Sequence, residues 1–204
     1  MAVPVPVPVP VAVPVAVPAP VRIAPEKPER IDHMTDTTAA TARAPYRVTF
    51  VCTGNICRSP MAEHMLRKAV EDEGLDAVVD SSGTGGWHVG DAADHRTVRT
   101  LRRHGFTSDH AARKFQRGWF DDYDLVIALD AGHLRELRAL ARDEKDRDKI
   151  RLLRSFDPAA ASPDLDVPDP YYADDEAFEH VMELIERAVP GILDEIRQGL
   201  KNAG

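Results

Sequence analysis

The sequence predicts an α/β fold in which a small, twisted parallel sheet of four strands lies between layers of helices. Two observations carry this prediction. Short β-branched and apolar segments alternate along the chain with longer segments whose apolar residues recur every three or four positions. The segment 124–129 is apolar throughout after Asp124, which is typical of a strand covered on both faces. Such alternation favours a three-layer domain with helices on both sides of a parallel sheet.

The expected strands are short and are separated by segments rich in turn residues. The first is β-branched and aromatic and leads directly into a loop that contains two cysteines. A glycine-rich loop is expected at 82–90, and a proline-bearing loop at 157–170. The four expected strands are 47–51, 77–81, 124–129 and 150–153.

The expected helices follow from apolar periodicity and from their start and stop residues. Ser59 and Pro60 suit the N-cap and the first position of a helix, and Gly74 suits its end. The last helix has an apolar stripe over 178–196. Two shorter helices are expected, at 92–104 and 134–141.

Residues 1–45 are expected to form a disordered tail before a single domain at 46–200. Residues 1–28 contain nine of the sixteen prolines, mostly alternating with valine. Each proline removes a backbone donor and fixes φ, so this segment favours an extended, unpacked chain. It lacks the basic start and the continuous apolar stretch of a secretory signal. Met34 is an alternative start of the natural protein, and a ligand for a partner module is an alternative role of the tail.

Composition narrows the class of protein. The formal net charge of −8 is unlike that of a general nucleic-acid binder, which usually shows a basic face. Only two cysteines are unlike an oxidised disulfide scaffold, so a cytoplasmic location is expected. Export without a signal would leave no trace in the sequence. No membrane association and no nucleic acid are expected, and nothing in the sequence requires more than a monomer.

The segment 52–59, Cys-Thr-Gly-Asn-Ile-Cys-Arg-Ser, suits a phosphate-binding loop with a nucleophile at its base. It joins a strand to a helix, and the free N–H groups at the start of a helix bind anions. Arg58 can hold two phosphate oxygens in a fork, and the same donors favour the nucleophilic thiolate of Cys52. The loop residues expected to bind phosphate are Thr53, Gly54, Asn55, Ile56, Cys57, Arg58 and Ser59.

Other readings of this loop fit less well. Two cysteines separated by four residues could be half of a metal site, but no second Cys pair or spaced His pair completes it, and no metal is expected. A nucleotide loop would end in Gly-Lys-Ser/Thr, and a dinucleotide loop would carry three spaced glycines; neither pattern is present. A small buried residue remains the alternative for Cys52 taken alone.

The segment Val51–Glu63 resembles the signature of the low-molecular-weight protein tyrosine phosphatases, and is most similar to bacterial, actinobacterial-like members. The resemblance spans residues 46–198. It implies hydrolysis of phosphotyrosine in proteins, with no cofactor. The further matching positions are Asp80–Thr84, Trp87–Gly90, Asp94, Arg96, His104, Gly105, His110, Arg113, Asp130 and Asp169–Tyr172.

The resemblance also implies a catalytic set and its supports. Cys52 would carry the phosphoryl group as a phosphocysteine, Arg58 would stabilise the phosphoryl oxygens, and Asp169 would act as general acid and then as base. Inorganic phosphate or other oxyanions should bind in the same loop. Asp130 is expected to be structural or to orient water. The positions expected to support the loop are Asn55, in a left-handed conformation, Ser59, Ser81, Asp94 and His110.

Specificity is expected to come from the depth of the site and from its aromatic walls. A phenyl phosphate can reach a nucleophile at the bottom of a slot that a phosphoserine cannot. Trp87, Tyr171 and Tyr172 could line such a slot by stacking, and ordinary rim packing is their alternative role.

Three other functions compete with phosphotyrosine hydrolysis. Related phosphoarginine phosphatases carry Thr at the position of Ile56, so an Ile there favours phosphotyrosine. An arsenate reductase of the same fold would need further cysteines after Cys57, and none is present. A non-catalytic phosphotyrosine-binding module is the third, against which the joint presence of Cys52, Arg58 and Asp169 argues.

Cys57 has two interpretations that the sequence leaves open. A reversible disulfide with Cys52 would protect the nucleophile from irreversible oxidation, which is a form of redox regulation. Alternatively, Cys57 is a small residue that fills space beneath the loop.

Overall fold

A computed structural model of the protein describes residues 44–160 and 164–202. The predictions for the tail and for a start at Met34 concern residues that lie outside these ranges, apart from residues 44 and 45. All the described residues belong to one unit, Thr41–Gly204.

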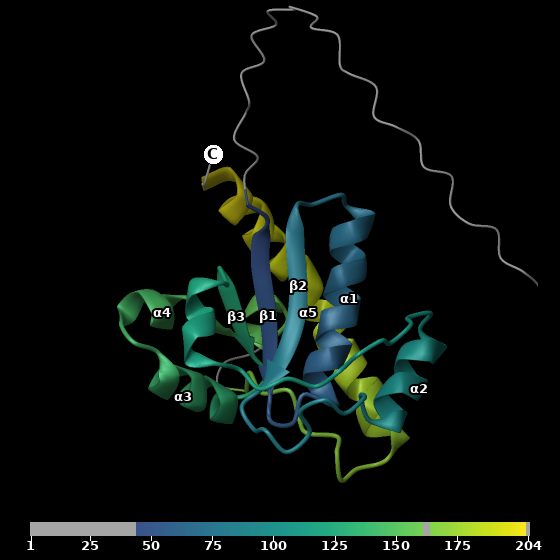
Figure 1. Cartoon of the computed structure of the whole chain (residues 1–204). Coiled ribbons are helices and arrows are strands. Elements are labelled where there is room, and N and C mark those ends of the chain that lie inside the picture. The colour runs from purple at the N-terminus through teal and green to yellow at the C-terminus, as the bar shows by residue number, and fades with distance from the viewer. Residues whose placement is uncertain (1–43, 161–163, 203–204) are drawn as a thin grey trace, which may run out of the picture. The chain divides into compact units, whose positions relative to one another are not determined.

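The centre of this unit is a sheet of four parallel strands in the order β2-β1-β3-β4 (Figure 1). This confirms the predicted four-stranded parallel sheet. The third strand is shorter than expected, because Asp124 precedes it and accepts a hydrogen bond from the Arg47 backbone N–H at 2.8 Å. The strands are β1 (Tyr46–Cys52), β2 (Ala77–Gly83), β3 (Leu125–Ala128) and β4 (Ile150–Leu152).

Helices cover both faces of the sheet, which confirms the three-layer arrangement. On one face α1 and α5 pack against each other and against β1, with Phe50, Ile127 and Phe178 in the core between them. On the other face Val126 and Phe120 belong to a second core cluster, which α3 helps to close. The helices are α1 (Arg58–Asp72), α2 (His95–Arg103), α3 (Ala131–Leu140), α4 (Glu144–Asp148) and α5 (Asp175–Asn202).

The helix starts differ from the predicted ones where side chains form caps. Asp94 accepts a hydrogen bond from the Arg96 N–H and begins α2, and Asp130 accepts one from the His133 N–H and begins α3. The prediction that Ser59 is the N-cap of the first helix is wrong. Cys57 occupies that position without a side-chain cap, and Ser59 already lies inside α1. The hydroxyl of Ser59 instead contacts Cys52 and Asn55 in the loop after β1.

Three short elements were not predicted from the sequence: η1 (Arg117–Asp121), η2 (Leu153–Phe156) and α4. The helix α4 is five charged residues long and has no apolar stripe. It depends on Asp143 as its N-cap and on Asp146, a buried carboxylate that pairs with Arg142 at 2.7 Å. Tertiary contacts rather than periodicity therefore define it.

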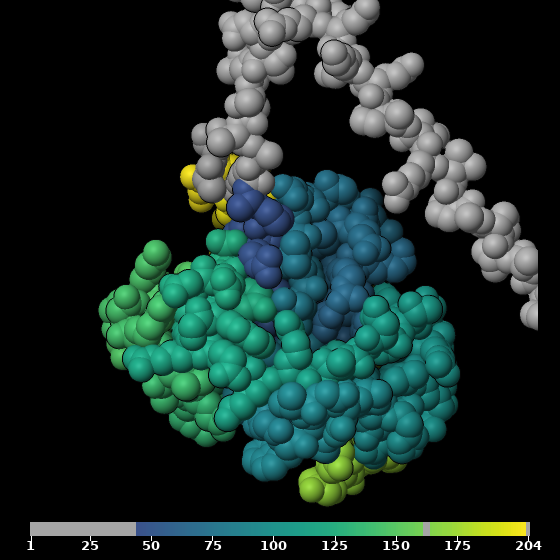
Figure 2. All heavy atoms as spheres, in the orientation of Figure 1, coloured from purple at the N-terminus to yellow at the C-terminus, as the bar shows by residue number. Residues whose placement is uncertain are grey.

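The loop that follows β1 lies at a switch in the sheet. The chain moves from β1 to β2 on one side and then returns to place β3 on the other side of β1. In open α/β sheets ligands bind at the carboxyl ends of the strands beside such a switch. Figure 1 shows the loop after β1, the segment that precedes α5 and the start of α2 at this end of the sheet, and Figure 2 shows the segment before α5 protruding there. In the described ranges, no helix is long and apolar enough to cross a membrane.

Gly191 supplies a test of how closely α5 packs on η2. A Cβ added at this position would clash with the carbonyl oxygen of Phe156, a backbone atom that cannot move away by a change of rotamer. We expect Gly191→Ala to lower the free energy of unfolding by about 1–3 kcal/mol through overpacking, despite the better helix propensity of Ala. Urea denaturation measures this.

Gly118 is the matched control, because nothing lies within 4 Å of a Cβ built there. Gly118→Ala should therefore leave the stability nearly unchanged. Equal stabilities of the two variants would contradict the close approach of α5 to η2.

Candidate active site

A pocket of about 190 Å³ opens above the loop after β1. Residues that the sequence predicted separately come together in it, from the loop, from the glycine-rich segment after β2 and from the segment before α5. His88, to which the sequence analysis gave no role, also lines the pocket. The lining residues are Cys52, Thr53, Gly54, Ile56, Cys57, Arg58, Trp87, His88, Asp169, Tyr171 and Tyr172.

Asn55 is the residue about which the loop turns. Its φ is 57°, and it is the only non-glycine residue with a positive φ among those described. Its amide nitrogen donates to Ser59 Oγ at 2.9 Å and to Ser81 Oγ at 2.8 Å, and its amide oxygen accepts from the Arg113 N–H at 2.7 Å. The side chain is completely buried. These bonds hold Asn55 in a conformation that costs free energy for residues other than glycine.

The backbone of the loop accepts hydrogen bonds from the segment that directly follows β2. The Thr84 N–H donates to the Cys52 carbonyl at 2.8 Å, and the Gly85 N–H donates to the Thr53 carbonyl at 2.9 Å. Gly83 is needed for this approach, because a Cβ there would lie 2.6 Å from the Thr53 carbonyl oxygen. The end of β2 therefore lies directly against the loop.

Asp94 supports the loop through its backbone rather than its side chain. Its N–H donates to the Ile56 carbonyl at 2.9 Å. Its carboxylate caps α2 and binds Arg96, whose guanidinium in turn donates to the Ala173 carbonyl at 3.2 Å. Arg96 also lies over the Tyr171 ring, 5.6 Å from its centroid. Asp94 and Arg96 thus link the loop to the segment that carries Asp169.

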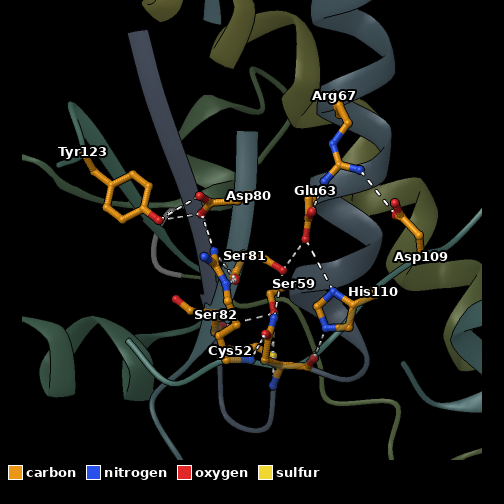
Figure 3. A network of polar contacts seen from close by, with 12 residues as sticks. Cys52, Ser59, Glu63, Arg67, Asp80, Ser81, Ser82, Asp109, His110 and Tyr123 are labelled. Carbon is orange, nitrogen blue, oxygen red and sulfur yellow. Dashed lines mark hydrogen bonds and ion pairs between the residues drawn. The ribbon is translucent and has the colours of Figure 1, made fainter. Parts of the chain in front are cut away.

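The sulfur of Cys52 has two polar neighbours at the base of the pocket. Ser59 Oγ lies 3.0 Å away and the Asn55 N–H donates to the sulfur at 3.3 Å (Figure 3). Ser59 Oγ accepts from Asn55, so the single proton of the hydroxyl is directed to the sulfur or to the Ser82 carbonyl at 3.3 Å. Both donors suit a thiolate acceptor.

Glu63 extends this network behind the loop, as Figure 3 shows. Its carboxylate accepts from Ser81 Oγ at 2.5 Å and lies 3.6 Å from Nδ1 of His110, whose Nε2 donates to the Asn55 carbonyl at 2.6 Å. Burial raises the pKa of Glu63, but the contacts with His110, Ser81 and Arg67 lower it more, so the net pKa is below its usual value. Because a carboxylate can only accept, Ser81 must donate to Glu63 and accept from Asn55.

No role of Glu63 was predicted from the sequence, although one signal was present. Glu63 directly follows Met61 and Ala62, both fully buried, and lies one turn before Leu66, which is buried as well. A carboxylate next to the apolar stripe of a helix is expected to have a specific partner. Its partners Ser81 and His110 come from distant segments, so the sequence could mark Glu63 but could not identify what it binds.

Arg58 is buried between two carboxylates. Its guanidinium donates to Asp130 at 2.9 Å and to Asp169 at 2.8 Å, and also to the Val167 carbonyl at 3.1 Å. Its Nε is buried and has no partner within the described ranges. Burial raises the pKa of Asp130, but His133 and Arg58 lower it further, so its net pKa is far below the usual value. Asp130 is therefore a fixed negative charge that orients Arg58.

Two of the three aromatic residues at the pocket are largely exposed, and Tyr171 is partly buried. Trp87 is 79% and Tyr172 is 96% exposed. The rings of Tyr171 and Tyr172 meet edge to face with their centroids 4.8 Å apart. Trp87 and Tyr172 form an exposed rim around the mouth of the pocket, whereas the polar loop forms its floor. In the described ranges, no group of three or more His, Cys, Asp or Glu side chains could hold a metal ion.

Comparisons with known proteins point to one family. Residues 47–202 match the family described as low molecular weight phosphotyrosine protein phosphatase. A protein from Streptomyces coelicolor named low molecular weight protein-tyrosine-phosphatase is 60% identical over 155 residues, which are 75% of this chain and 94% of that protein. The low molecular weight protein-tyrosine phosphatase A of Mycobacterium tuberculosis is 48% identical over 162 residues, 78% of this chain and 97% of that protein.

Solved structures agree with these similarities. A protein tyrosine phosphatase from Entamoeba histolytica, with Hepes in its active site, superposes with a TM-score of 0.71 and 30% identity, over 76% of this chain and 98% of that one. A Drosophila arginine phosphatase superposes with a TM-score of 0.67 and 33% identity, over 72% and 96% of the two chains. The fold alone therefore does not separate proteins named for tyrosine from one named for arginine.

The role of Glu63 can be tested by Glu63→Gln. We expect this variant to lose about 1–3 kcal/mol of stability at pH 7, because a charged acceptor for Ser81 and His110 is removed. A carboxyl whose folded pKa is lowered contributes stability above its unfolded pKa of ~4.3 and loses it as the pH falls through the folded value. The stability difference between wild type and Glu63→Gln should therefore shrink below about pH 4.

Urea unfolding at pH 7 and at acidic pH measures this, with Glu71→Gln as the control. Glu71 is an exposed residue of the same helix. A stability difference for Glu63→Gln that is the same at both pH values would show that the carboxylate charge is not responsible.

Proposed function

Because the chain belongs to the low-molecular-weight phosphotyrosine protein phosphatase family, we propose that it hydrolyses phosphotyrosine in proteins through a phosphocysteine on Cys52. The observation that carries the proposal is the meeting of Cys52, Arg58 and Asp169 at one pocket, although Asp169 lies far along the chain from the other two. Phosphotyrosine-containing proteins are the proposed substrates, and inorganic phosphate or other oxyanions would bind in the same loop.

The proposed first step transfers the phosphoryl group to Cys52. A bond forms between Sγ and phosphorus while the bond from phosphorus to the tyrosine oxygen breaks, and Asp169 gives its proton to that oxygen. Arg58 and the N–H groups of the loop bind the three other phosphoryl oxygens. In the second step water attacks phosphorus and gives a proton to Asp169, the bond to sulfur breaks, and inorganic phosphate leaves.

The contacts of Arg58 require Asp169 to move before the first chemical step. Its guanidinium contacts Asp130 and Asp169, so a phosphoryl group competes with Asp169 for the same donors. Asp169 must exchange its contact with Arg58 for one with the leaving oxygen before it can act as an acid. The Asp169 side chain is half exposed, whereas that of Asp130 is 22% exposed, so Asp169 can exchange its contact more readily than Asp130 could.

The supporting and specificity roles are proposed on the same basis. Asn55, Ser59, Ser81, Asp94 and His110 would hold the loop in shape for the phosphoryl group. Trp87, Tyr171 and Tyr172 would contact the phenyl ring and the flanking peptide, because all three line the pocket. The remaining loop residues, Thr53, Gly54, Ile56 and Cys57, would line the phosphate site.

Phosphoarginine hydrolysis is the alternative with a specific observation in its favour, since the Drosophila arginine phosphatase shares the fold. Ile56 lines the pocket and offers no hydroxyl to a phosphoramidate. Arsenate reduction by a cysteine relay would need further cysteines, and the sequence has none after Cys57. A binding module without catalysis would not need an acid such as Asp169.

We propose that residues 46–200 form the phosphatase domain and that residues 1–45 are a tail that takes no part in catalysis, with Met34 as an alternative start. The family match over 47–202 supports the first boundary. A monomer in the cytoplasm, bound to neither nucleic acid nor membrane, is the proposed working form; both cysteines are free thiols, as a reducing compartment would keep them.

Turnover of aryl phosphates tests the function. Cys52→Ser should abolish hydrolysis of p-nitrophenyl phosphate, because the hydroxyl is a much weaker nucleophile than the thiolate. Asp169→Asn should lower kcat for phenyl phosphate about 10²–10⁴-fold, as expected for a general acid, with little change in KM. The loss should be smaller for p-nitrophenyl phosphate, whose leaving oxygen needs less protonation. Equal losses for the two substrates would rule out Asp169 as the acid, and activity of Cys52→Ser would rule out the phosphocysteine.

Oxidation with peroxide tests the proposed redox role of Cys57. Peroxide would convert the Cys52 thiolate to a sulfenic acid, and attack by the Cys57 thiol would form a disulfide and release water. Burial and the nearby Asp94 raise the pKa of Cys57 to about 12, so its thiolate is scarce at neutral pH and disulfide closure should be slow. Recovery of activity by thiols should therefore increase with the pH of oxidation and should be lower in Cys57→Ser. Equal recovery in both proteins would contradict a protective disulfide.

A further inference from the structure

His133 is a buried histidine at the pocket that the catalytic steps above do not use. It lies in the first turn of α3 and is 3% exposed. Its Nε2 lies 2.8 Å from Oγ1 of Thr53, the loop residue next to the nucleophile. Its Nδ1 lies 2.9 Å from Oδ1 of Asp130, whose other oxygen binds Arg58 at 2.9 Å. His133 thus connects the fixed carboxylate of the site to a hydroxyl of the phosphate-binding loop.

The protonation state of His133 determines which of the two residues, His133 or Thr53, donates the hydrogen bond between them. Next to the Asp130 carboxylate, Nδ1 needs its proton, since a lone pair there would face a negative oxygen. The contact is electrostatic rather than a well-aligned hydrogen bond, since the geometry at Nδ1 does not satisfy one. With neutral imidazole, Nε2 is then an acceptor, and the Thr53 hydroxyl donates its hydrogen bond to it. With imidazolium, Nε2 donates to Thr53, and the hydroxyl proton becomes free for another acceptor.

We propose that His133 is a positioning residue whose protonation turns the Thr53 hydroxyl into a donor for the bound phosphoryl group. The inference rests on the proposed role of the loop as an oxyanion site. Thr53 lines the pocket, and its hydroxyl can donate to a bound oxyanion only when it does not donate to Nε2 of His133. An oxyanion would therefore bind more tightly to the protonated form, and binding would draw a proton onto His133, since the two equilibria are linked.

The charges around His133 make this coupling specific to an anion. Among the described residues, Asp130, the N-cap of α3, is the one charged side chain that pairs with His133, and Arg58 faces it from the loop through Asp130. From the segment before α5, the Asp169 carboxylate pairs with Arg58, and Asp166 accepts from the Ala131 N–H at the start of α3. An oxyanion that takes over part of Arg58 adds negative charge beside this group. The imidazolium compensates that charge from the buried side of the loop.

Calorimetry of sulfate binding tests the proposal. Sulfate keeps its charge across pH 5–8, unlike phosphate, and the Cys52→Ser background removes the titration of the thiol. Binding heats in two buffers of different ionisation enthalpy give the number of protons taken up. We expect Cys52→Ser protein to take up a fraction of a proton when it binds sulfate, and to bind sulfate about tenfold more weakly at pH 8 than at pH 5.

Two variants in this background isolate the route of the effect. His133→Asn should abolish the proton uptake. Thr53→Val removes the hydroxyl without altering the buried ring and should reduce the uptake. It decides the question even if His133→Asn folds poorly. His64→Asn, a change at another buried histidine outside the loop contacts, should leave the uptake unchanged.

The outcomes separate this inference from the proposed function. Undiminished uptake in either the His133 or the Thr53 variant would overturn the proposal, and so would a failure of sulfate to bind. Failure of the wild type to hydrolyse aryl phosphates, with His133-dependent proton uptake intact, would reject the proposed function and leave the oxyanion coupling standing.

Discussion

The site depends on the left-handed backbone of Asn55. This one dihedral curls the loop above the start of α1 and directs its N–H toward the Cys52 sulfur. It persists because the amide side chain uses both its donors and its acceptor, on Ser59, Ser81 and Arg113. Each of these partners comes from a different element, so the sheet, α1 and the segment before η1 must all be assembled before the loop has its shape. The strain in the loop is therefore offset by the folded domain as a whole.

The sequence predicted what is local. The four strands, the loop between β1 and α1 and the long apolar stripe of α5 follow from periodicity and residue type within a few positions. The prediction of Ser59 as the N-cap was wrong because its hydroxyl, which would cap α1, instead contacts Cys52 and Asn55. The short α4 was missed for a related reason, since its stability comes from the Arg142–Asp146 pair and not from an apolar stripe.

The polar partners of the site were the least predictable part. Glu63 and His133 each act on the loop through a residue distant in the chain, Ser81 in the first case and Thr53 in the second. Periodicity identifies a polar residue beside an apolar stripe but does not identify its hydrogen-bond partner. The partner decides whether such a residue has a structural or a functional role. The general-acid role of Asp169 was predicted from the family resemblance. The ion pairs of Arg58 with both Asp130 and Asp169 were found only in the structure.

The ion pairs of Arg58 with Asp130 and Asp169 affect which anions can bind in the pocket. The guanidinium already has its counter-ions within the protein, so binding at this group is an exchange of one anion for another rather than neutralisation of a bare cation. A small monoanion such as chloride offers one contact in place of the Asp169 carboxylate and gains little by the exchange. A tetrahedral dianion adds the N–H groups of the loop, which Asp169 does not contact. The pocket thereby discriminates by the number of oxygens an anion presents, and ordinary cellular salt should compete with it only weakly.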